Sequence, residues 1–591
     1  MKAALQYLHE ILTLLGDDRQ KLPAIVVLFL MASLLDLVGL SLIGPYLTLL
    51  INSEKGTTGY LGHWEKYLDI NWNWETKILM TGLGLVLIFF LKALGNLLIQ
   101  YGIMKFSLRQ EIRLRTYLMH TYQKMPYNMY LSRNSSEYIH SVQILAGSYG
   151  GVLFVFLKGG SDIIVASVII LILAYENIMM LSILLCILGV LATIYDKSFK
   201  KRLREYGEQN NKANHQILKS LHEGIEGLKE VRILQKEKYF YSRLEKGAKK
   251  AAGLAIKKNL INLVPGYLLE FLLVMFVAGT VSLNILLGVT PTEFIPVLGL
   301  FAIGALRLKP IVNSLLGSLL DLRYNRDNIR RLTKDLEKIN EVKRELIEQF
   351  SESKVEIEFK ELKLKQVNFT YQGMKEPTLQ NINLKIEAGE MIGLIGKSGC
   401  GKTTLVDLIL GLLKPESGTV EINGINLSMA LGQWQKQVAY LPQQIFMIDE
   451  KLKNNVAIGE DDEIDVNLVE ESLSKACLSE FVESLPDGVR TELGERGIRI
   501  SGGQRQRVAL ARAFYHKCNV IVMDESTSAL DTATEREIVT EIRKLKGQKT
   551  IIVIAHRLST LQHCDKVYKL EKSGIVNVSK KKEILEELSI K

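Results

Sequence analysis

A glycine-rich run in the second half of the chain has the spacing of a phosphate-binding loop. Residues 396–403 read Gly-Lys-Ser-Gly-Cys-Gly-Lys-Thr, which fits the pattern G-x-x-x-x-G-K-[ST]. Glycines let backbone N–H groups close around phosphate oxygens, and the N-terminus of a following helix adds positive potential. The residues predicted to bind ATP here are Gly396, Lys397, Ser398, Gly399, Cys400, Gly401, Lys402, Thr403 and Thr404. Lys402 is expected to reach the β- and γ-phosphates, and Thr403 to hold Mg²⁺.

The loop requires a strand before it and a helix after it, and the sequence supplies both. Residues 391–395 form a continuous apolar run, as in a buried strand. Residues 404–413 are an apolar stretch that suits a helix. This context favours a true nucleotide loop over a glycine-rich turn of no consequence.

Two carboxylates follow another apolar strand of the same domain. Residues 520–523 lead directly into Asp524 and Glu525. Asp524 is suited to holding the Mg²⁺ shell, and Glu525 to orienting and deprotonating the attacking water. A strand that ends in Asp-Glu is weak evidence alone, but after a phosphate-binding loop it indicates ATP hydrolysis.

Three further residues at strand ends are candidates for the same site. Gln443 is suited to contacting Mg²⁺ and the attacking water. His556 is suited to hydrogen-bonding the γ-phosphate, although a histidine at a strand end is more often structural. Tyr371 is expected to be exposed and to stack on adenine, with an ordinary aromatic residue at a strand end as the alternative.

A second helix N-terminus predicts that two chains share the ATP site. Residues 500–504 read Ile-Ser-Gly-Gly-Gln and open a predicted helix, so their N–H groups can bind phosphate. The predicted ATP-binding residues of this segment are Ser501, Gly502, Gly503 and Gln504. Because the chain carries one such domain, two copies arranged head to tail would complete the site. The sequence therefore predicts a homodimer with an isologous interface.

The first half of the chain is rich in apolar segments long enough to cross a membrane, for which about 20 residues are needed. Six candidate spans lie at residues 23–50, 78–102, 150–175, 178–195, 260–287 and 294–316. Several apolar patterns continue past the bilayer, so some helices should project into the cytoplasm. Residues 1–21 predict an amphipathic helix on the membrane surface, with no cleavable signal peptide.

Basic residues set the predicted orientation. The formal net charge is +10, and Lys and Arg cluster at 105–133 and 197–258, whereas the short loops 175–177 and 288–293 have neither. Membrane proteins show this bias on the cytoplasmic side, which accounts for the charge better than nucleic-acid binding does. We therefore expect a multi-pass protein of the inner membrane with its ATPase domain in the cytoplasm. The five scattered cysteines fit free thiols in reducing cytosol.

The predicted fold class is a membrane α-helical domain of six transmembrane helices followed by an α/β P-loop ATPase domain. The expected boundaries are 1–340 for the membrane domain, 341–356 for a charged linker and 357–591 for the ATPase domain. Residues 125–130 and 215–219, at the tips of the two long basic loops, each predict a short helix that contacts the ATPase domain. Residues 60–68 predict an amphipathic helix at the outer interface, with an ordinary structured loop as the alternative.

Charged residues inside the spans are candidate substrate contacts, because a charge in lipid is costly. Lys92, Lys158 and Arg307 lie on three helices, ~20–25 Å below the outer helix ends at a rise of 1.5 Å per residue. A cationic belt at that depth suits an anionic head group that enters from the cytoplasmic leaflet. Lys309 adds a fourth cation to this predicted substrate site.

These charges also have structural interpretations. Lys158 is four residues from Asp162, so the two side chains are at the spacing of a helical ion pair. Glu270 is a possible partner for one of the cations. A long side chain such as Lys92 can also extend along the helix to reach the membrane surface.

Together these motifs resemble one family over nearly the whole chain, the ATP-binding-cassette (ABC) transporters of exporter type. Residues 396–404 resemble its Walker A motif, and residues 520–525 resemble its Walker B motif. Residues 500–504 resemble its LSGGQ signature, with Ile500 in place of Leu, and residues 491–497 resemble its exporter-specific loop. Gln443 matches its Q-loop, residues 528–531 match its D-loop, and His556 matches its switch histidine. The resemblance implies coupling helices at about 126–135 and 215–224. The presence of Glu525 implies a hydrolytically competent site in both protomers.

Within exporters, the membrane half resembles flippases of lipid-linked oligosaccharides of the PglK type, which serve bacterial protein glycosylation. The resemblance rests on residues 35–39, 125–127, 133–135, 227–231 and 306–310. It implies ATP-driven transfer of a polyprenyl-pyrophosphate oligosaccharide from the cytoplasmic to the outer leaflet, with Arg307 and its neighbours receiving the diphosphate. The alternatives are an exporter of another lipid, a peptide or a drug, and a non-transporting ATP-gated channel or sensor.

Overall fold

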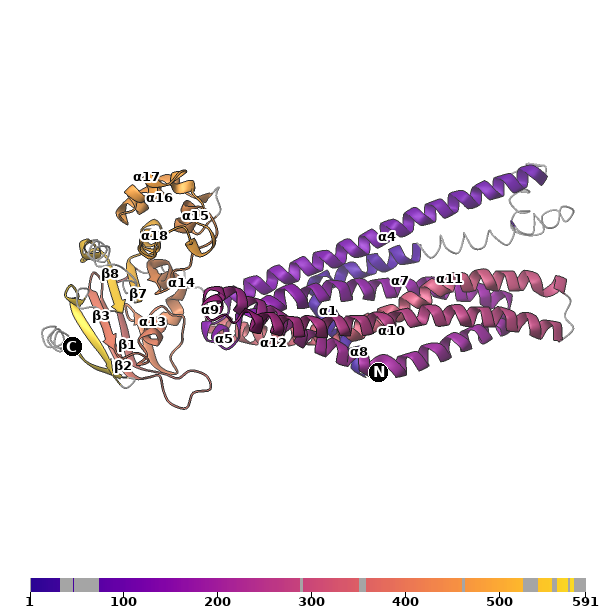
Figure 1. The fold of residues 1–591 in the computed structure, drawn as a ribbon, viewed down its shortest axis with the longest axis horizontal. Coiled ribbons are helices and arrows are strands. Elements are labelled where there is room, and N and C mark those ends of the chain that lie inside the picture. The colour runs from indigo at the N-terminus through magenta and orange to yellow at the C-terminus, as the bar shows by residue number, and fades with distance from the viewer. Residues whose placement is uncertain are drawn as a thin grey trace. The chain divides into compact units, whose positions relative to one another are not determined.

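The computed structural model of the chain describes residues 2–31, 46, 74–286, 291–349, 358–459, 463–524, 540, 542–554, 561–571 and 574–578 (Figure 1). The chain divides into two compact units. One comprises residues 1–124 and 133–340, and the other comprises 125–132 and 341–591. All strands of the described residues belong to the second unit, and each unit is described by itself.

The described part of the first unit is helical. Its elements are α1 Lys2–Leu15, η1 Gly16–Lys21, α4 Trp74–Lys124, α6 Ser135–His140, η2 Ser141–Leu145, α7 Ala146–Glu176, α8 Ile178–Glu226, α9 Leu228–Ile233, α10 Glu237–Leu286, α11 Pro291–Tyr324 and α12 Arg326–Gln349, of which α12 continues into the predicted linker. The longest helices, α4, α8 and α10, have 51, 49 and 50 residues. At 1.5 Å per residue each is roughly 75 Å long, more than twice the ~30 Å hydrocarbon core. These lengths agree with the prediction that several helices project beyond the bilayer.

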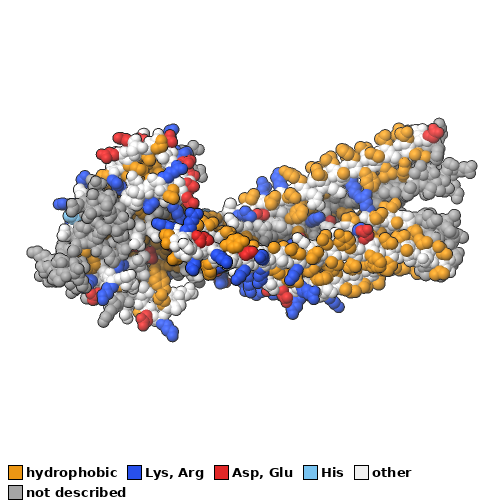
Figure 2. Space-filling view, viewed as in Figure 1, with side chains coloured by type: hydrophobic (Ala, Val, Ile, Leu, Met, Phe, Trp, Pro, Cys, Tyr) orange, Lys and Arg blue, Asp and Glu red, His pale blue; other side chains and the backbone are white. Residues whose placement is uncertain are grey.

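Five stretches of the described helices are long and apolar enough to cross a membrane. They are Ile78–Lys124, Ser135–Glu176, Ile178–Glu226, Glu237–Ser282 and Phe301–Tyr324, and each overlaps one predicted span. In Figure 2 hydrophobic side chains cover one half of the long helices, while Lys and Arg gather along the other half. The predicted span at 23–50 lies largely outside the described residues, as does the predicted outer helix at 60–68.

The N-terminal helix α1 is packed against protein along one face. Ile11 and Leu15 are fully buried in a cluster that includes Leu118 of α4 and Tyr149 of α7. The Tyr149 hydroxyl donates a hydrogen bond to the Ile11 carbonyl oxygen at 3.3 Å. Part of the apolar face that was predicted to lie on the membrane is therefore covered by other helices.

The tip of the second cytoplasmic loop differs from the prediction. Residues 215–219 lie inside α8, and the short helix at the tip is α9. The predicted range of 215–224 was wrong because Gly227, not Gly224, ends α8. Gly224 stays helical, and a Cβ built on it would lie 3.4 Å from the Phe240 ring. A glycine lowers helix propensity but does not by itself end a helix. At the first loop the structure confirms a short helix, α5 (Tyr127–Leu131).

The second unit contains two sheets. Its strands are β1 Glu361–Phe369, β2 Leu379–Glu387, β3 Met391–Gly396, β4 Ser417–Ile422, β5 Ile425–Asn426, β6 Val438–Leu441, β7 Val520–Asp524, β8 Thr550–Ile554, β9 Lys566–Glu571 and β10 Gly574–Val578. The antiparallel sheet has the order β2-β1-β4-β5. The other has the order β10-β9-β3-β8-β7-β6, in which the strands from β9 to β6 are parallel. Its buried strands explain why the runs at 391–395, 520–523 and 551–554 are continuously apolar.

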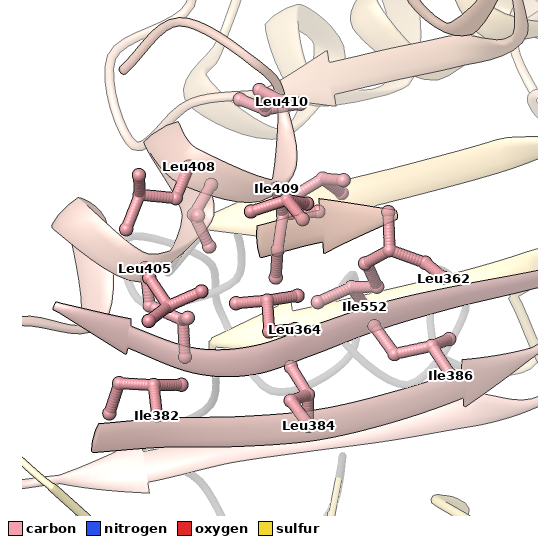
Figure 3. Packing of buried hydrophobic residues seen from close by; sticks show 14 of the residues in the cluster. Leu362, Leu364, Ile382, Leu384, Ile386, Leu405, Leu408, Ile409, Leu410 and Ile552 are labelled. Atoms are coloured by element: carbon pink, nitrogen blue, oxygen red, sulfur yellow. The ribbon is translucent and has the colours of Figure 1, made fainter. Parts of the chain in front are cut away.

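The helices of this unit, besides α5, are α13 Lys402–Ile409, α14 Leu427–Gln437, α15 Leu452–Ala457, α16 Val466–Lys475, α17 Ser479–Ser484, η4 Gly488–Arg490, η5 Glu495–Gly497 and α18 Gly502–Tyr515. Figure 3 shows Leu405, Leu408 and Ile409 of α13 packed among strand side chains that include Leu364 and Ile552. All five side chains are 0–2% exposed. Burial of this kind stabilises the fold by about 1.5–3 kcal/mol per large side chain, so α13 is held firmly at the end of the phosphate loop.

Candidate ATP site and intramembrane cations

The glycine-rich loop joins β3 to α13, as the sequence predicts. Gly399 and Gly401 have φ of +81° and +98°, in the left-handed region that glycine enters at no steric cost. A Cβ on Gly401 would lie 3.0 Å from the Thr378 carbonyl oxygen, which leaves no room for a side chain. At Gly399 a Cβ would meet no atom of the described chain within 4 Å, so its backbone borders open space. The loop therefore has the shape of a backbone cradle for an anion.

Lys402 lies at the base of this cradle. Its side chain is 7% exposed, and its ammonium donates hydrogen bonds to the carbonyl oxygens of Gly396 at 2.8 Å and Lys397 at 3.2 Å. Thr403 is exposed at the first turn of α13, where a hydroxyl could hold a metal ion, while Thr404 is buried. The exposed Lys397 and Ser398 and the half-buried Cys400 complete the loop.

Parallel strands bring Asp524 and Gln443 to the same edge of the sheet. Asp524 ends β7 opposite Ile554 of β8, and Ile554 also lies opposite Leu394 of β3. Gln443 follows β6, the neighbour of β7. Glu525 and His556 come just after β7 and β8, outside the described residues, so their positions in the site stay predictions.

Two residues that the sequence analysis did not single out lie beside the predicted metal ligand. The Tyr440 hydroxyl donates a hydrogen bond to Asp524 Oδ2 at 3.4 Å. Asp407 on α13 is 8% exposed, and burial together with the nearby charge of Asp524 raises the pKa of its carboxyl from 3.8 to about 6. Burial, then the charges of Asp524 and Asp407, also raise the pKa of Tyr440. Asp407 is the only charged residue of the apolar stretch 404–413, and that signal could have identified it.

The segment at 500–504 forms the start of α18. Ser501 is the N-cap, and its hydroxyl accepts a hydrogen bond from Gln504 N at 3.2 Å. The Gln504 side chain accepts one in return from Ser501 N at 2.8 Å. This capping box, which the spacing S-x-x-Q could have revealed, leaves Gly502 and Gly503 to present N–H groups at the helix end.

Tyr371 lies near the phosphate loop but is half-buried, not exposed as predicted. Its hydroxyl forms a hydrogen bond of 3.1 Å with the Thr404 hydroxyl. Its ring meets Phe369 edge-on, with 5.0 Å between the ring centroids. The hydrogen bond places Tyr371 beside the P-loop helix, and stacking on adenine stays a prediction.

Two of the predicted intramembrane cations contact the same aromatic ring. Lys92 Nζ of α4 lies 5.4 Å from the centre of the Phe89 ring, and Arg307 Cζ of α11 lies 5.3 Å from it. These are cation–π distances. Lys92 is 7% exposed, so its side chain is buried within the described part of the chain. Sequence analysis had no signal for Phe89, because one phenylalanine in a span is ordinary.

The other two cations have different surroundings. Lys309 Nζ forms an ion pair of 2.8 Å with Glu270 of α10, which confirms the structural interpretation of that acid. Within the described residues Lys158 forms no ion pair with Asp162, and one Asp162 carboxylate oxygen is buried without a hydrogen bond. The predicted cations therefore do not share one environment. Lys92 and Arg307 contact the same aromatic ring, whereas Lys309 is neutralised by Glu270.

Both units match models of one protein family. Residues 379–528 match a model described as ABC transporter, and residues 22–289 match one described as ABC transporter transmembrane region. The chain is an ABC transporter of exporter type. The two matched regions are those of a half-transporter.

Relatives of this exporter include proteins named ATP-dependent lipid A-core flippase. The one from Pasteurella multocida is 27% identical over 526 residues, which is 85% of each chain. The one from Escherichia coli is 27% identical over 472 residues, or 76% of each chain. The one from Ralstonia nicotianae is 39% identical over 229 residues, or 38% of this chain and 39% of the relative.

A solved structure shares the fold of the exporter. It is described as a bacterial Atm1-family ABC exporter with ATP bound, and it superposes with a TM-score of 0.75 at 19% identity. The match covers 96% of this chain and 97% of that one. The predicted fold class, a helical membrane domain followed by an α/β ATPase domain, is therefore confirmed.

The exporter hydrolyses ATP to drive transport, with ATP and Mg²⁺ as its cofactors. The residues described above fit these groups. The left-handed glycines form an anion cradle that ends at the N-terminus of α13, which suits a nucleotide phosphate. An exposed Thr403 hydroxyl and the Asp524 carboxylate provide oxygen donors, which Mg²⁺ prefers.

Proposed function

We propose that this exporter moves a phosphate-bearing lipid, specifically a polyprenyl-pyrophosphate oligosaccharide, from the cytoplasmic to the outer leaflet. The observation that carries the proposal is the contact of both Lys92 and Arg307 with the Phe89 ring. A diphosphate concentrates negative charge on one small group, and two neighbouring cations match it. Arg307 forms no ion pair within the described residues, so its guanidinium is available for phosphate oxygens.

A lipid is favoured over a peptide or a drug. The relatives are named lipid A-core flippases, which makes lipid A-core the second candidate substrate. A site lined by aromatic residues without cations would have favoured a drug instead. We assign Arg307 and Lys92 to the head group and leave Lys309 outside the site, because Glu270 already neutralises it. Lys158 is a candidate for a more distant part of the substrate.

The proposed catalytic roles follow the arrangement of the strands. Lys402 would bind the β- and γ-phosphates, and Thr403, Asp524 and Gln443 would hold Mg²⁺. Glu525 would take the proton of the attacking water, with His556 on the γ-phosphate, and Tyr371 would contact adenine. Ser501 to Gln504 would close the site of a second copy, so we propose a homodimer.

We also propose the inner membrane as the location, with the ATPase domain in the cytoplasm and domain boundaries near residues 340 and 357. Basic residues along one half of the long helices support this orientation (Figure 2). The phosphate loop is intact, and Ser501 caps the helix that begins with the signature motif. Both features are those of an ATP-hydrolysing site, which favours a transporter over a non-hydrolysing channel or sensor.

The test is ATPase stimulation in proteoliposomes by added lipid. Undecaprenyl-pyrophosphate oligosaccharide and lipid A-core are compared for the wild type and for Arg307→Ala. Stimulation by the first lipid, lost in Arg307→Ala while basal hydrolysis survives, supports the proposal. Stimulation by lipid A-core alone would replace the proposed substrate with the second candidate.

The matched control changes a cation two residues away. Lys309→Gln combined with Glu270→Gln removes an ion pair without leaving a lone charge. We expect this double variant to retain lipid stimulation. An equal loss of lipid stimulation in the control and in Arg307→Ala would show that any charge change in this region disrupts transport. That result would contradict the assignment of Arg307 to the lipid head group.

A further inference from the structure

Two histidine rings lie next to each other where α6 meets α8. The ring centroids of His140 on α6 and His215 on α8 are 6.1 Å apart, and the ring planes are nearly perpendicular, at 88°. His140 is 6% exposed, whereas His215 is half-buried. Both residues belong to the first compact unit, so their contact lies within one unit. No local spacing connects them, because they are 75 positions apart in the sequence.

The histidine pair lies outside the hydrocarbon core of a membrane. His140 is 36 residues from Glu176, the far end of its continuous helical stretch, and His215 is 37 residues from Ile178, where α8 begins. At 1.5 Å per residue these separations are roughly 54 and 55 Å, well beyond the ~30 Å core. Ions dissolved in water can therefore reach this level of the helices.

One ring nitrogen of the buried histidine lacks a partner. His140 Nε2 is enclosed by protein and forms no hydrogen bond within the described residues. In a neutral imidazole one nitrogen is a donor and the other is an acceptor, and the acceptor lone pair is also a metal ligand. Since buried polar atoms are rarely left unsatisfied, this nitrogen calls for a ligand or a proton partner.

The backbone next to His140 departs from the regular α-helix. Ser141–Leu145, the element η2, is a π-helical turn between α6 and α7. Such turns contain an extra residue and are frequent at functional sites. Because the wider turn rotates the residues before it relative to those after it, it sets the direction in which the His140 side chain leaves the helix.

We infer that His140 and His215 together bind a transition-metal ion such as Zn²⁺ or Cu²⁺. With metal–nitrogen bonds of about 2.0–2.1 Å, two imidazoles that share one ion have ring centroids roughly 5–6.5 Å apart. The observed 6.1 Å lies in this range. Imidazole suits Zn²⁺ and Cu²⁺, whereas Mg²⁺ takes oxygen ligands, so this site is distinct from the magnesium site of ATP. The inference does not depend on the transported lipid.

The chain provides two ligands for this ion. In the part of the chain that the structure describes, no group of three or more His, Cys, Asp or Glu side chains could hold a metal. Structural zinc sites have four protein ligands, whereas sites with fewer keep positions for water. The ion is therefore exchangeable with solution, and it holds α6 against α8 while it is bound.

A packing role explains the histidine pair less completely. Two rings that meet edge-on are an ordinary core contact. Phenylalanine would make the same contact without burying a ring nitrogen that has no partner. The two interpretations therefore differ for His140→Phe, which keeps an aromatic ring in the core but removes the metal ligand.

The test uses Cu²⁺ and Zn²⁺ as probes. The full-length exporter is purified in detergent with a tag that contains no histidine, and it is freed of metal before titration. Electron paramagnetic resonance of bound Cu²⁺ counts the coordinated imidazoles, and competition with a fluorescent chelator measures Zn²⁺ affinity. Wild type is compared with His140→Phe and His215→Phe. The matched control is His120→Phe, which removes an exposed histidine of α4.

We expect the wild type to bind one Cu²⁺ per chain through two imidazoles. His140→Phe and His215→Phe should each weaken Zn²⁺ binding about tenfold or more, because loss of an outer partner of a ligand alone costs that much. Zn²⁺ should raise the unfolding temperature of the wild type and of His120→Phe, but not of the other two variants.

Three results would overturn the inference. They are a wild-type Cu²⁺ signal from fewer than two imidazoles, unchanged Zn²⁺ affinity in His140→Phe or His215→Phe, and an equal loss of affinity in His120→Phe. The imidazole count is measured on the wild type, so it decides the matter even where a variant does not fold. ATP hydrolysis without added Zn²⁺ shows which variants are folded.

Discussion

The ammonium of Lys309 on α11 lies 2.8 Å from a carboxylate oxygen of Glu270 on α10, which makes an ion pair between two predicted transmembrane helices. In lipid an unpaired charge is costly, so each residue is tolerated because the other is present. The pair therefore contributes to helix packing, whereas Arg307, two residues earlier, contacts the Phe89 ring of α4.

Removing one member of this pair should be worse than removing both. Glu270→Gln leaves Lys309 without its partner, and we expect a lower unfolding temperature in detergent, measured by fluorescence-detected size exclusion after heating. Adding Lys309→Gln should restore much of the loss, because no lone charge then remains. A double variant less stable than either single variant would contradict this account.

Lys402 should be essential for hydrolysis. Its ammonium is already held at the loop by hydrogen bonds to the carbonyl oxygens of Gly396 and Lys397. Lys402→Ala should lower kcat at least about 100-fold, because a preorganised charge at the transferring phosphate is lost. The measurement is phosphate release at saturating ATP. Lys436→Ala, which removes an exposed lysine of α14, should stay near the wild-type rate and serves as the control.

Asp407 should make the ATPase unit less stable as pH rises through the acid range. The pKa of Asp407 is raised in the folded state to about 6 from 3.8, so the folded chain binds the proton more tightly than the unfolded chain does. Protonation of Asp407 therefore stabilises the folded state relative to the unfolded state. The favourable contribution is complete below about pH 4 and is lost as pH rises towards 6. The difference amounts to at most about 3 kcal/mol. Asp407→Asn should therefore raise the free energy of unfolding at pH 7 and flatten its pH dependence.

The measurement is denaturant unfolding followed by the fluorescence of the tryptophans, including Trp434, which is buried in the cluster with α13. Profiles of the wild type and Asp407→Asn should converge at low pH and separate between pH 4 and 6. Parallel profiles over that range would show that another group causes the pH dependence.

Gly207 should be intolerant of any side chain. A Cβ there would lie 2.0 Å from the Tyr324 carbonyl oxygen, so α8 and the end of α11 could not keep their spacing. Backbone cannot move aside as a flexible side chain does, and we expect Gly207→Ala to cost about 3 kcal/mol or more. Thermal unfolding in detergent checks this. Gly189→Ala on the same helix is the control, since a Cβ there meets no described atom within 4 Å.

The ATPase motifs could be predicted from sequence because their chemistry is local. Binding phosphate through backbone N–H groups requires glycine at particular spacings, and a following helix requires an apolar run. The loop from Gly396 to Lys402 accordingly joins β3 to α13 as expected. Apolar length likewise predicts membrane helices, since the bilayer thickness sets a minimum. The tip of the second loop could not be predicted, because nothing in the local sequence distinguishes Gly224, which stays helical, from Gly227, which ends α8.

By itself, then, the sequence determined an exporter with one ATPase domain and several intramembrane cations. Only the tertiary structure decided which cations act together. Arg307 and Lys309 are two residues apart, so a helix turns them about 200° from one another. One therefore meets Phe89 on α4 and the other meets Glu270 on α10. The packing of Tyr127 against the cluster that contains Leu405 is of the same kind, because it brings together residues that no spacing connects.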